Sequence, residues 1–250
     1  MSKHRNKRAA MADHRWIWLL IAAVSILIAV VLLVWLLAGR GSGDPVKPTV
    51  PQSTTYPAKI DEVENVCVNL SFGMRIVDVG KYTGIYMEDG TDEIVSGLLM
   101  IIVENTGTQD VQYAQIKMQI GNQTATFKMS TLPAGESIIL LEQERMPYTE
   151  GTITWAAAED VVLFPEPMSL RQDRIQLQAL NGAINVTNIS GEDITGDVVI
   201  YYKNYTYGQL YGGVTYRCVI RGGIKAGEMK QIHAQHYRPT VSRVMFVTCG

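Results

Sequence analysis

The stretch VENTGTQDV at positions 103–111 is echoed by VTNISGEDI at positions 186–194. An offset of 83 aligns the two stretches and places Asn105 on Asn188. In both, turn-forming residues separate two apolar runs, since Asn and Asp side chains bond to the nearby backbone and Gly permits positive φ. The pattern predicts that one strand–turn–strand unit occurs twice in the chain.

A second echo follows further along the chain. LPAGES at 132–137 matches IKAGEM at 224–229 at an offset of 92, so the second copy holds nine more residues between its echoes. We expect this insertion in the tyrosine-rich stretch YYKNYTYGQLYGGVTYR at 201–217. Two echoes in the same order indicate a tandem duplication of one domain. The turn residues of the two copies are Asn105, Gly107, Gly135, Asn188, Gly191 and Gly227, with Gly107 and Gly191 one place out of alignment.

Apolar residues beyond position 60 occur in short runs, many of them alternating, such as GLLMIIVEN at 97–105 and DVVIYY at 197–202. Gly, Asn, Asp and Pro separate the runs, and no long stretch has the apolar stripe of a helix. Many short strands at this spacing predict a β-sandwich. We therefore expect a mainly β protein with one sandwich at 60–165 and a second at 166–250.

One long apolar run stands before these strands. From Trp16 to Gly39 no residue is charged, and the run exceeds the about 20 residues that span a bilayer as a helix. The indole rings of Trp16, Trp18 and Trp35 suit the membrane interface. A cleaved signal peptide is the alternative, although its apolar core has about 7–15 residues. We expect an uncleaved single transmembrane helix.

Charge gives the orientation of this helix. Basic residues stay on the cytoplasmic side, and residues 1–15 are rich in them, so these residues form a cytoplasmic tail. Residues 40–59, rich in Pro, Ser and Thr, form an extended linker to the extracytoplasmic domains. Residues 1–40 hold six of the 22 Lys and Arg and one of the 24 Asp and Glu, which leaves 41–250 with a charge of −7. An acidic balance disfavours nucleic acid as a partner.

These motifs resemble a known family. A strand that ends in Val-x-Asn, a polar turn, the run VVIYYKN at 198–204 and a Leu-x-x-Gly-Glu-Ser turn are similar to FxLYD-type and related immunoglobulin-like domains. The similarity covers 94–155 and 175–247. Such domains occur in membrane-anchored extracytoplasmic proteins of Gram-positive bacteria. The resemblance implies two tandem immunoglobulin-like modules without catalytic residues.

The sequence lacks the usual motifs of catalysis. It contains no Gly-x-Ser-x-Gly nucleophile motif and no P-loop. His233 and His236 are three positions apart, so on a strand they point to opposite faces and do not share a metal ion. We expect no enzymatic activity and no cofactor.

Cysteines offer one candidate covalent link. Cys218 and Cys249 both lie in the second copy on expected strands, and an extracytoplasmic compartment permits a disulfide between them. The alternative is that they are free buried thiols that pack as small hydrophobic groups. Cys67 is the odd third residue.

The tyrosine-rich stretch is the candidate binding surface. Tyrosine offers apolar area with a polar tip, which suits protein docking or glycan stacking. The alternative is a long hairpin with cross-strand aromatic pairs. The residues concerned are Tyr201, Tyr202, Tyr205, Tyr207, Tyr211 and Tyr216.

Together these features predict a membrane-anchored, non-enzymatic binding or accessory module of the cell envelope. Its expected partners are the lipid bilayer and an envelope protein or cell-wall polymer. A passive structural spacer and an envelope enzyme with an unrecognised site remain as alternatives.

Overall fold

The computed structural model describes residues 58–250, which form strands and one short 3-10 helix, η1 (Ser71–Gly73). The expected tail, the apolar run with Trp16, Trp18 and Trp35, and nearly all of the linker lie outside these residues. Between residues 58 and 250, no helix combines the length and apolar character needed to cross a membrane.

The mainly β class is confirmed. The strands are β1 (Lys59–Asn69), β2 (Met74–Ile85), β3 (Ile94–Asn105), β4 (Val111–Ile120), β5 (Gln123–Leu132), β6 (Ser137–Leu141), β7 (Ile153–Leu163), β8 (Ile175–Leu180), β9 (Ala183–Asn188), β10 (Val198–Thr206), β11 (Gln209–Ile220), β12 (Met229–His233) and β13 (Ser242–Cys249).

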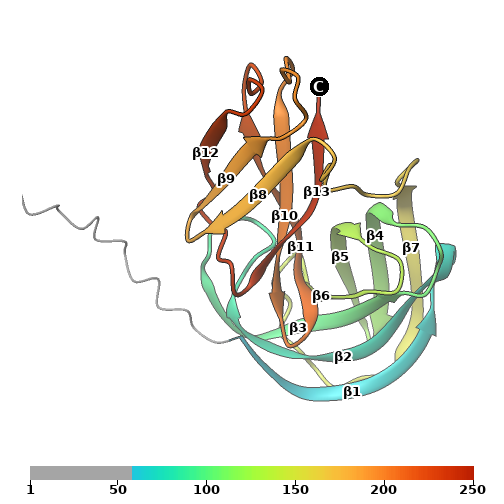
Figure 1. Ribbon diagram of the computed structural model, residues 1–250. Helices are drawn as coiled ribbons and strands as arrows, with labels where there is room; N and C mark the ends of the chain where they lie inside the picture. Colours follow the sequence, from blue (N-terminus) through green and yellow to red (C-terminus); the bar gives the residue numbers. More distant parts are fainter. Residues whose placement is uncertain (1–57) are drawn as a thin grey trace, which may run out of the picture. The chain divides into compact units, whose positions relative to one another are not determined.

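Three sheets contain these strands (Figure 1). The largest has seven strands in the order β1-β2-β3-β6-β11-β10-β13, and the other two have the orders β5-β4-β7 and β12-β9-β8. Every ladder is antiparallel except the one between β6 and β11, which is parallel and short. The seven-stranded sheet therefore joins the first half of the chain to the second through one parallel contact.

Strand order repeats between the two halves. The first half pairs β2-β3-β6 and β5-β4-β7, and the second half pairs β8-β9-β12 and β11-β10-β13 in the same relative order. Each set of six strands forms a two-layered sandwich. β1 precedes the first set and has no counterpart strand in the second set, which leaves the two halves different at one edge.

Asn105 fixes the turn after β3 from a fully buried position. Its side-chain amide donates to the carbonyl oxygens of Gln109 at 2.9 Å and Leu132 at 3.2 Å. Its side-chain oxygen accepts the backbone N–H of Gly107 at 3.0 Å. The side chain thereby gives hydrogen-bond partners to backbone groups at two neighbouring turns. Without these partners, the buried carbonyl oxygens would be unpaired and would destabilise the fold.

Asn188 makes the same three contacts after β9. Its amide donates to the carbonyl oxygens of Glu192 at 2.7 Å and Ile224 at 3.0 Å, and its oxygen accepts the N–H of Ser190 at 3.0 Å. Because Ser190 takes the place of Gly107, Gly191 falls one position later, at φ 79°.

The second repeated turn closes on the same two asparagines. Gly135 and Gly227 adopt positive φ, 77° and 72°. Their N–H groups donate to the carbonyl oxygens of Asn105 and Asn188 at 2.7 and 3.0 Å. The left-handed conformation that these turns require explains why glycine stands in both copies.

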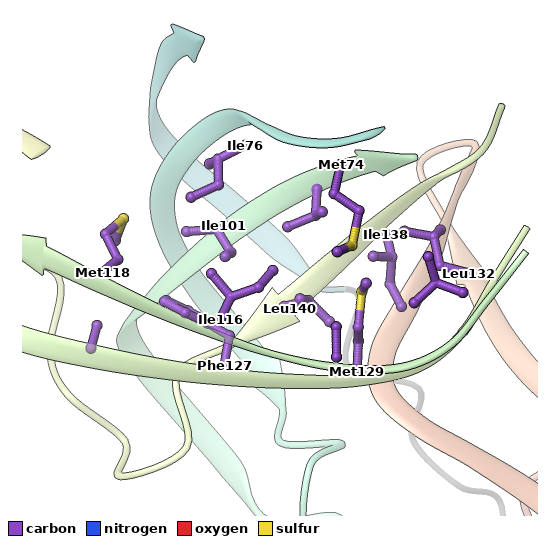
Figure 2. Packing of buried hydrophobic residues seen from close by; sticks show 14 of the residues in the cluster. Met74, Ile76, Ile101, Ile116, Met118, Phe127, Met129, Leu132, Ile138 and Leu140 are labelled. Atoms are coloured by element: carbon purple, nitrogen blue, oxygen red, sulfur yellow. The ribbon is translucent and has the colours of Figure 1, made fainter. Parts of the chain in front are cut away.

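Each sandwich has its own apolar core, and a third core lies at their junction. The strands of β5-β4-β7 pack on the seven-stranded sheet through the first core, part of which Figure 2 shows. The second core lies between β12-β9-β8 and the β10, β11 and β13 strands. Strand β3 is buried on both faces: Leu99, Ile101 and Val103 belong to the first core, and Leu98, Met100 and Ile102 belong to the third. Tyr211 of the second half completes the third core.

The nine-residue insertion is distributed over three places, so the sequence prediction was only partly right. The isolated bridge between Ile194 and Ile224 is the counterpart of the first pair of the β4–β5 ladder. After this bridge, both strands of the hairpin contain unpaired residues before the β10–β11 ladder begins. These residues are 195–197 and 221–223. Only the remaining part lies within the tyrosine-rich stretch.

That remaining part is a bulge in β11. Tyr202 pairs with Tyr216 and Asn204 pairs with Tyr211, so Lys203 alone faces residues 212–215. The extra residues of a bulge have backbone groups without a partner in the ladder, and such groups need other hydrogen-bond partners. These partners come from a buried charge network at the junction.

Candidate binding groove

Two of the six tyrosines of the suggested binding surface are buried, so the prediction is wrong for them. Tyr202 is 2% exposed and packs in the second core against Tyr237 and Tyr216. Tyr211 is 8% exposed, and its hydroxyl contacts Tyr82. Both point inward because cross-strand packing in the hairpin and the third core buries their rings.

The remaining tyrosines do not form one surface either. Tyr201 stacks on Phe246 with ring centroids 4.2 Å apart, and Tyr216 stacks on His236 at 4.6 Å. Tyr205 and Tyr207 are exposed near the hairpin tip, where the Tyr207 hydroxyl donates to the Ala58 carbonyl oxygen. The hairpin tip thus holds the start of β1, and the stretch is mainly structural.

The candidate disulfide is also wrong. Cys218 and Cys249 are free thiols on strands β11 and β13, which lie on opposite sides of β10. They pair with Ile200 and Val198 respectively. Their Cα atoms are separated by two strand spacings of about 4.8 Å each. This separation exceeds the Cα–Cα distance of about 7 Å beyond which a disulfide cannot form.

The histidines face different neighbours. The ring of His236 lies 3.3 Å from the Asp92 carboxylate, whereas His233 is exposed at the end of β12. Among residues 58–250, no three His, Cys, Asp or Glu side chains gather as a metal site would require.

A buried lysine fills the bulge of β11. Lys203 is 0% exposed, and its ammonium group donates to the carbonyl oxygens of Ser130 at 2.9 Å, Gly213 at 3.2 Å and Val214 at 3.0 Å. Three acceptors match the three donors of a protonated amine. Burial lowers the pKa of Lys203, and the nearby Glu88 carboxylate opposes that shift.

Glu88 completes this network on its other side. Its carboxylate accepts the N–H groups of Gly213 at 2.8 Å and Leu141 at 3.1 Å. Burial raises the pKa of the Glu88 carboxyl, and these two hydrogen bonds and Lys203 oppose the rise. Gly213 therefore links the two charged groups, and the network ties β5, β6 and β11 together. Its role is to provide hydrogen-bond partners for the backbone groups of the bulge at the junction of the sandwiches.

A hollow of the surface lies elsewhere, between the edge strands β8 and β13. It has a volume of about 690 Å³. Ile175 and Ile184, both 1% exposed, belong to its floor, and Ile189, 50% exposed, lies on its rim. The other lining residues are Leu170, Gln172, Gln176, Leu177, Ala179, Tyr237, Ser242, Arg243 and Val244. We call this hollow the β8–β13 groove.

The groove exists because the second sandwich has no counterpart of β1. In the first sandwich β1 pairs with β2, and Val66 and Val68 of β1 pack against the first core. The hollow that remains beside β1 and β7 is about 280 Å³. In the second sandwich, the chain before β8 bonds to β13 instead, through Val247 N–H to the Ser169 carbonyl oxygen at 2.8 Å.

Sequence reasoning missed the groove because its residue types are ordinary for strands. One signal was present: the segment before β8 begins Phe-Pro-Glu-Pro (164–167), and proline lacks the N–H that a ladder requires. This segment is unsuited to the pairing that β1 makes. No protein-family model, no curated protein and no solved structure matches the chain.

Proposed function

We propose that this chain is a non-enzymatic, membrane-anchored extracytoplasmic protein that binds an envelope partner through the β8–β13 groove. The apolar run from Trp16 to Gly39 and the basic residues before it support the anchor and its orientation. The resemblance to immunoglobulin-like modules of membrane-anchored bacterial proteins supports the same location and two tandem modules of that type.

The groove is the observation that carries the binding role. Its about 690 Å³ falls within the range of about 300–1,000 Å³ that ligand sites occupy. It combines a buried apolar floor with polar groups at the rim, among them Gln176 and Ser242. A passive spacer requires no such hollow, so the groove favours a binding module over the spacer alternative.

The chemistry of the lining favours binding over catalysis. Tyr237 and Arg243 are the two ionisable side chains that line the groove, and Arg243 already pairs with Glu136. Acid–base or nucleophilic chemistry needs several titratable groups that converge on one reacting atom. The groove instead offers apolar area and amide groups, which fit recognition.

Photocrosslinking in the cells that produce the protein tests this function. Ile189→benzoylphenylalanine places a crosslinker on the groove rim, and Val162→benzoylphenylalanine on β7 is a matched control because the two residues are 50% and 47% exposed. We expect an adduct from the Ile189 position alone, in the membrane fraction, that protease added outside intact cells degrades. Equal adducts from both positions, or none from the groove, would contradict the proposal.

A further inference from the structure

Strand β8 differs from the other edge strands of residues 58–250. The edge strands β1, β5, β7, β12 and β13 each carry at least one charged side chain, such as Lys128 on β5 or Arg243 on β13. β8 reads IQLQAL and carries none, and its ladder with β9 has no register shift. Proteins normally protect an edge with charge, proline or a bulge, because an unprotected edge pairs with other strands. β8 lacks all three protections.

The first sandwich shows what such an edge accepts. Met74 at the start of β2 pairs with Asn105, and Ile175 at the start of β8 pairs with Asn188, so β2 and β8 occupy equivalent positions. On its other edge β2 holds β1 as an antiparallel strand. The equivalent edge of β8 has no strand beside it within the described part of the chain.

The register identifies which side chains an added strand would bring. Val68 of β1 stands opposite Ile76, whose equivalent on β8 is Leu177, a residue of the groove lining. Val66 lies within the bulge of β1 between Asn65 and Val68, and it packs against the first core as Val68 does. An antiparallel strand on β8 therefore places two apolar side chains, two positions apart, over the groove.

From these observations we infer that β8 binds an extended peptide segment of a partner protein as an added antiparallel strand, with alternating apolar side chains in the groove. This inference rests on the proposed binding function and names the partner class. Main-chain hydrogen bonds to β8 supply affinity, and the groove selects the side chains. The lining contains no Asp or Glu, so it accepts a neutral or acidic segment. The segment is free of proline where it pairs, since proline cannot donate to the ladder.

The sequence of β1 provides a probe of this chemistry. The probe is a fluorescent synthetic peptide with the sequence of residues 60–70 that carries Cys67→Ser, and its partner is the full-length chain in lipid nanodiscs. We expect saturable binding by fluorescence anisotropy below about 1 mM. A second peptide that also carries Val66→Ser and Val68→Ser should bind at least about tenfold more weakly, because each substitution removes an apolar side chain that the groove would bury.

Two further comparisons separate strand addition from simple apolar contact. Ile189→Asp in the protein should weaken binding at least about fivefold, whereas Val162→Asp, at a matched exposure on β7, should leave it unchanged. Peptides N-methylated at alternate amides should behave unequally, because one set of amides faces β8 and the other faces solvent. Only the set that faces β8 should abolish binding.

Three results would overturn the inference. These are no saturable binding of the probe, equal binding by the Ile189→Asp and unaltered proteins, or equal effects of both methylated peptides. If the probe fails while the crosslink at position 189 forms in cells, the binding function stands and the peptide class is wrong. If both fail, the binding function fails with it.

Discussion

At the scale of single residues, the Lys203–Glu88 network explains an otherwise unfavourable burial of charge. Isolated charges inside a protein are unstable unless they are paired and hydrogen-bonded. Here every hydrogen of the Lys203 ammonium has a carbonyl acceptor, and both oxygens of Glu88 accept backbone N–H groups. The two groups stabilise a bulge whose backbone would otherwise lack partners.

The raised pKa of Glu88 predicts a pH-dependent contribution to stability. Between its ordinary pKa of 4.5 and the raised pKa of about 7, the folded chain keeps a proton that the unfolded chain has lost. The stabilisation is therefore fully present below pH 4.5 and is lost as the pH rises toward 7. Each pH unit in this window removes at most about 1.4 kcal/mol. We expect the free energy of unfolding of the wild type, relative to Glu88→Gln, to fall between about pH 5 and about pH 8.

Urea denaturation at both pH values measures this difference. Glu144→Gln, in the exposed loop after β6, is the control for loss of a surface carboxylate outside the network. A constant difference between wild type and Glu88→Gln would contradict the titration of Glu88 in this range.

At the scale of elements, the β11 bulge depends on a residue without a side chain. A Cβ on Gly213 would lie 2.6 Å from the Glu88 Oε2 atom and closer still to the Lys128 carbonyl oxygen of β5. Both neighbours belong to the junction, so neither moves without disturbing it. We expect Gly213→Ala to lower the free energy of unfolding by about 2–4 kcal/mol.

Gly135→Ala is the comparison for this variant. Gly135 has φ 77° and open space around its Cβ position, so the substitution introduces only backbone strain of about 1–2 kcal/mol. Urea denaturation of the two variants separates steric overlap from strain. Equal destabilisation would mean that β5 and β11 pack less closely than the structure shows.

At the scale of the whole described region, the shared sheet predicts that both sandwiches unfold together. Trp155 on β7 reports on the first sandwich once Trp16, Trp18 and Trp35 are replaced by Phe. Ile184→Ala creates a cavity in the second core and should destabilise the fold by about 2–5 kcal/mol. We expect the Trp155 fluorescence transition to move to lower urea concentration.

Met229→Ala on β12 is the control, because Met229 is 57% exposed in the second sandwich and its truncation opens no cavity. If Ile184→Ala leaves the Trp155 transition unchanged, the sandwiches unfold independently. Cooperative unfolding is the expectation because the third core and the β6–β11 ladder belong to both halves.

The sequence predicted what depends on local chemistry. The β class follows from apolar runs such as 97–105, and the positions of Asn105 and Asn188 follow from turn preferences. Strand β2 was harder to see, since Gly80 and Gly84 interrupt its apolar pattern.

The junction and the groove could not be read from local patterns. The β6–β11 ladder joins segments about 70 residues apart, and its register depends on tertiary packing rather than on propensity. The groove arises from a strand that one copy lacks, and Leu177 and Val244 look like any other strand residues. The burial of Tyr202 and Tyr211 likewise depends on cores that form only when distant strands meet.

The parallel contact between β6 and β11 also bears on how such a protein can change over generations. A gene fragment that encoded either copy alone would expose an unpaired strand edge and would separate Tyr211 from the rest of the third core. Recombination that separates the copies is therefore disfavoured, and further duplication would have to copy both together. The pair, and not the single sandwich, is the unit that can be inherited or transferred to another chain.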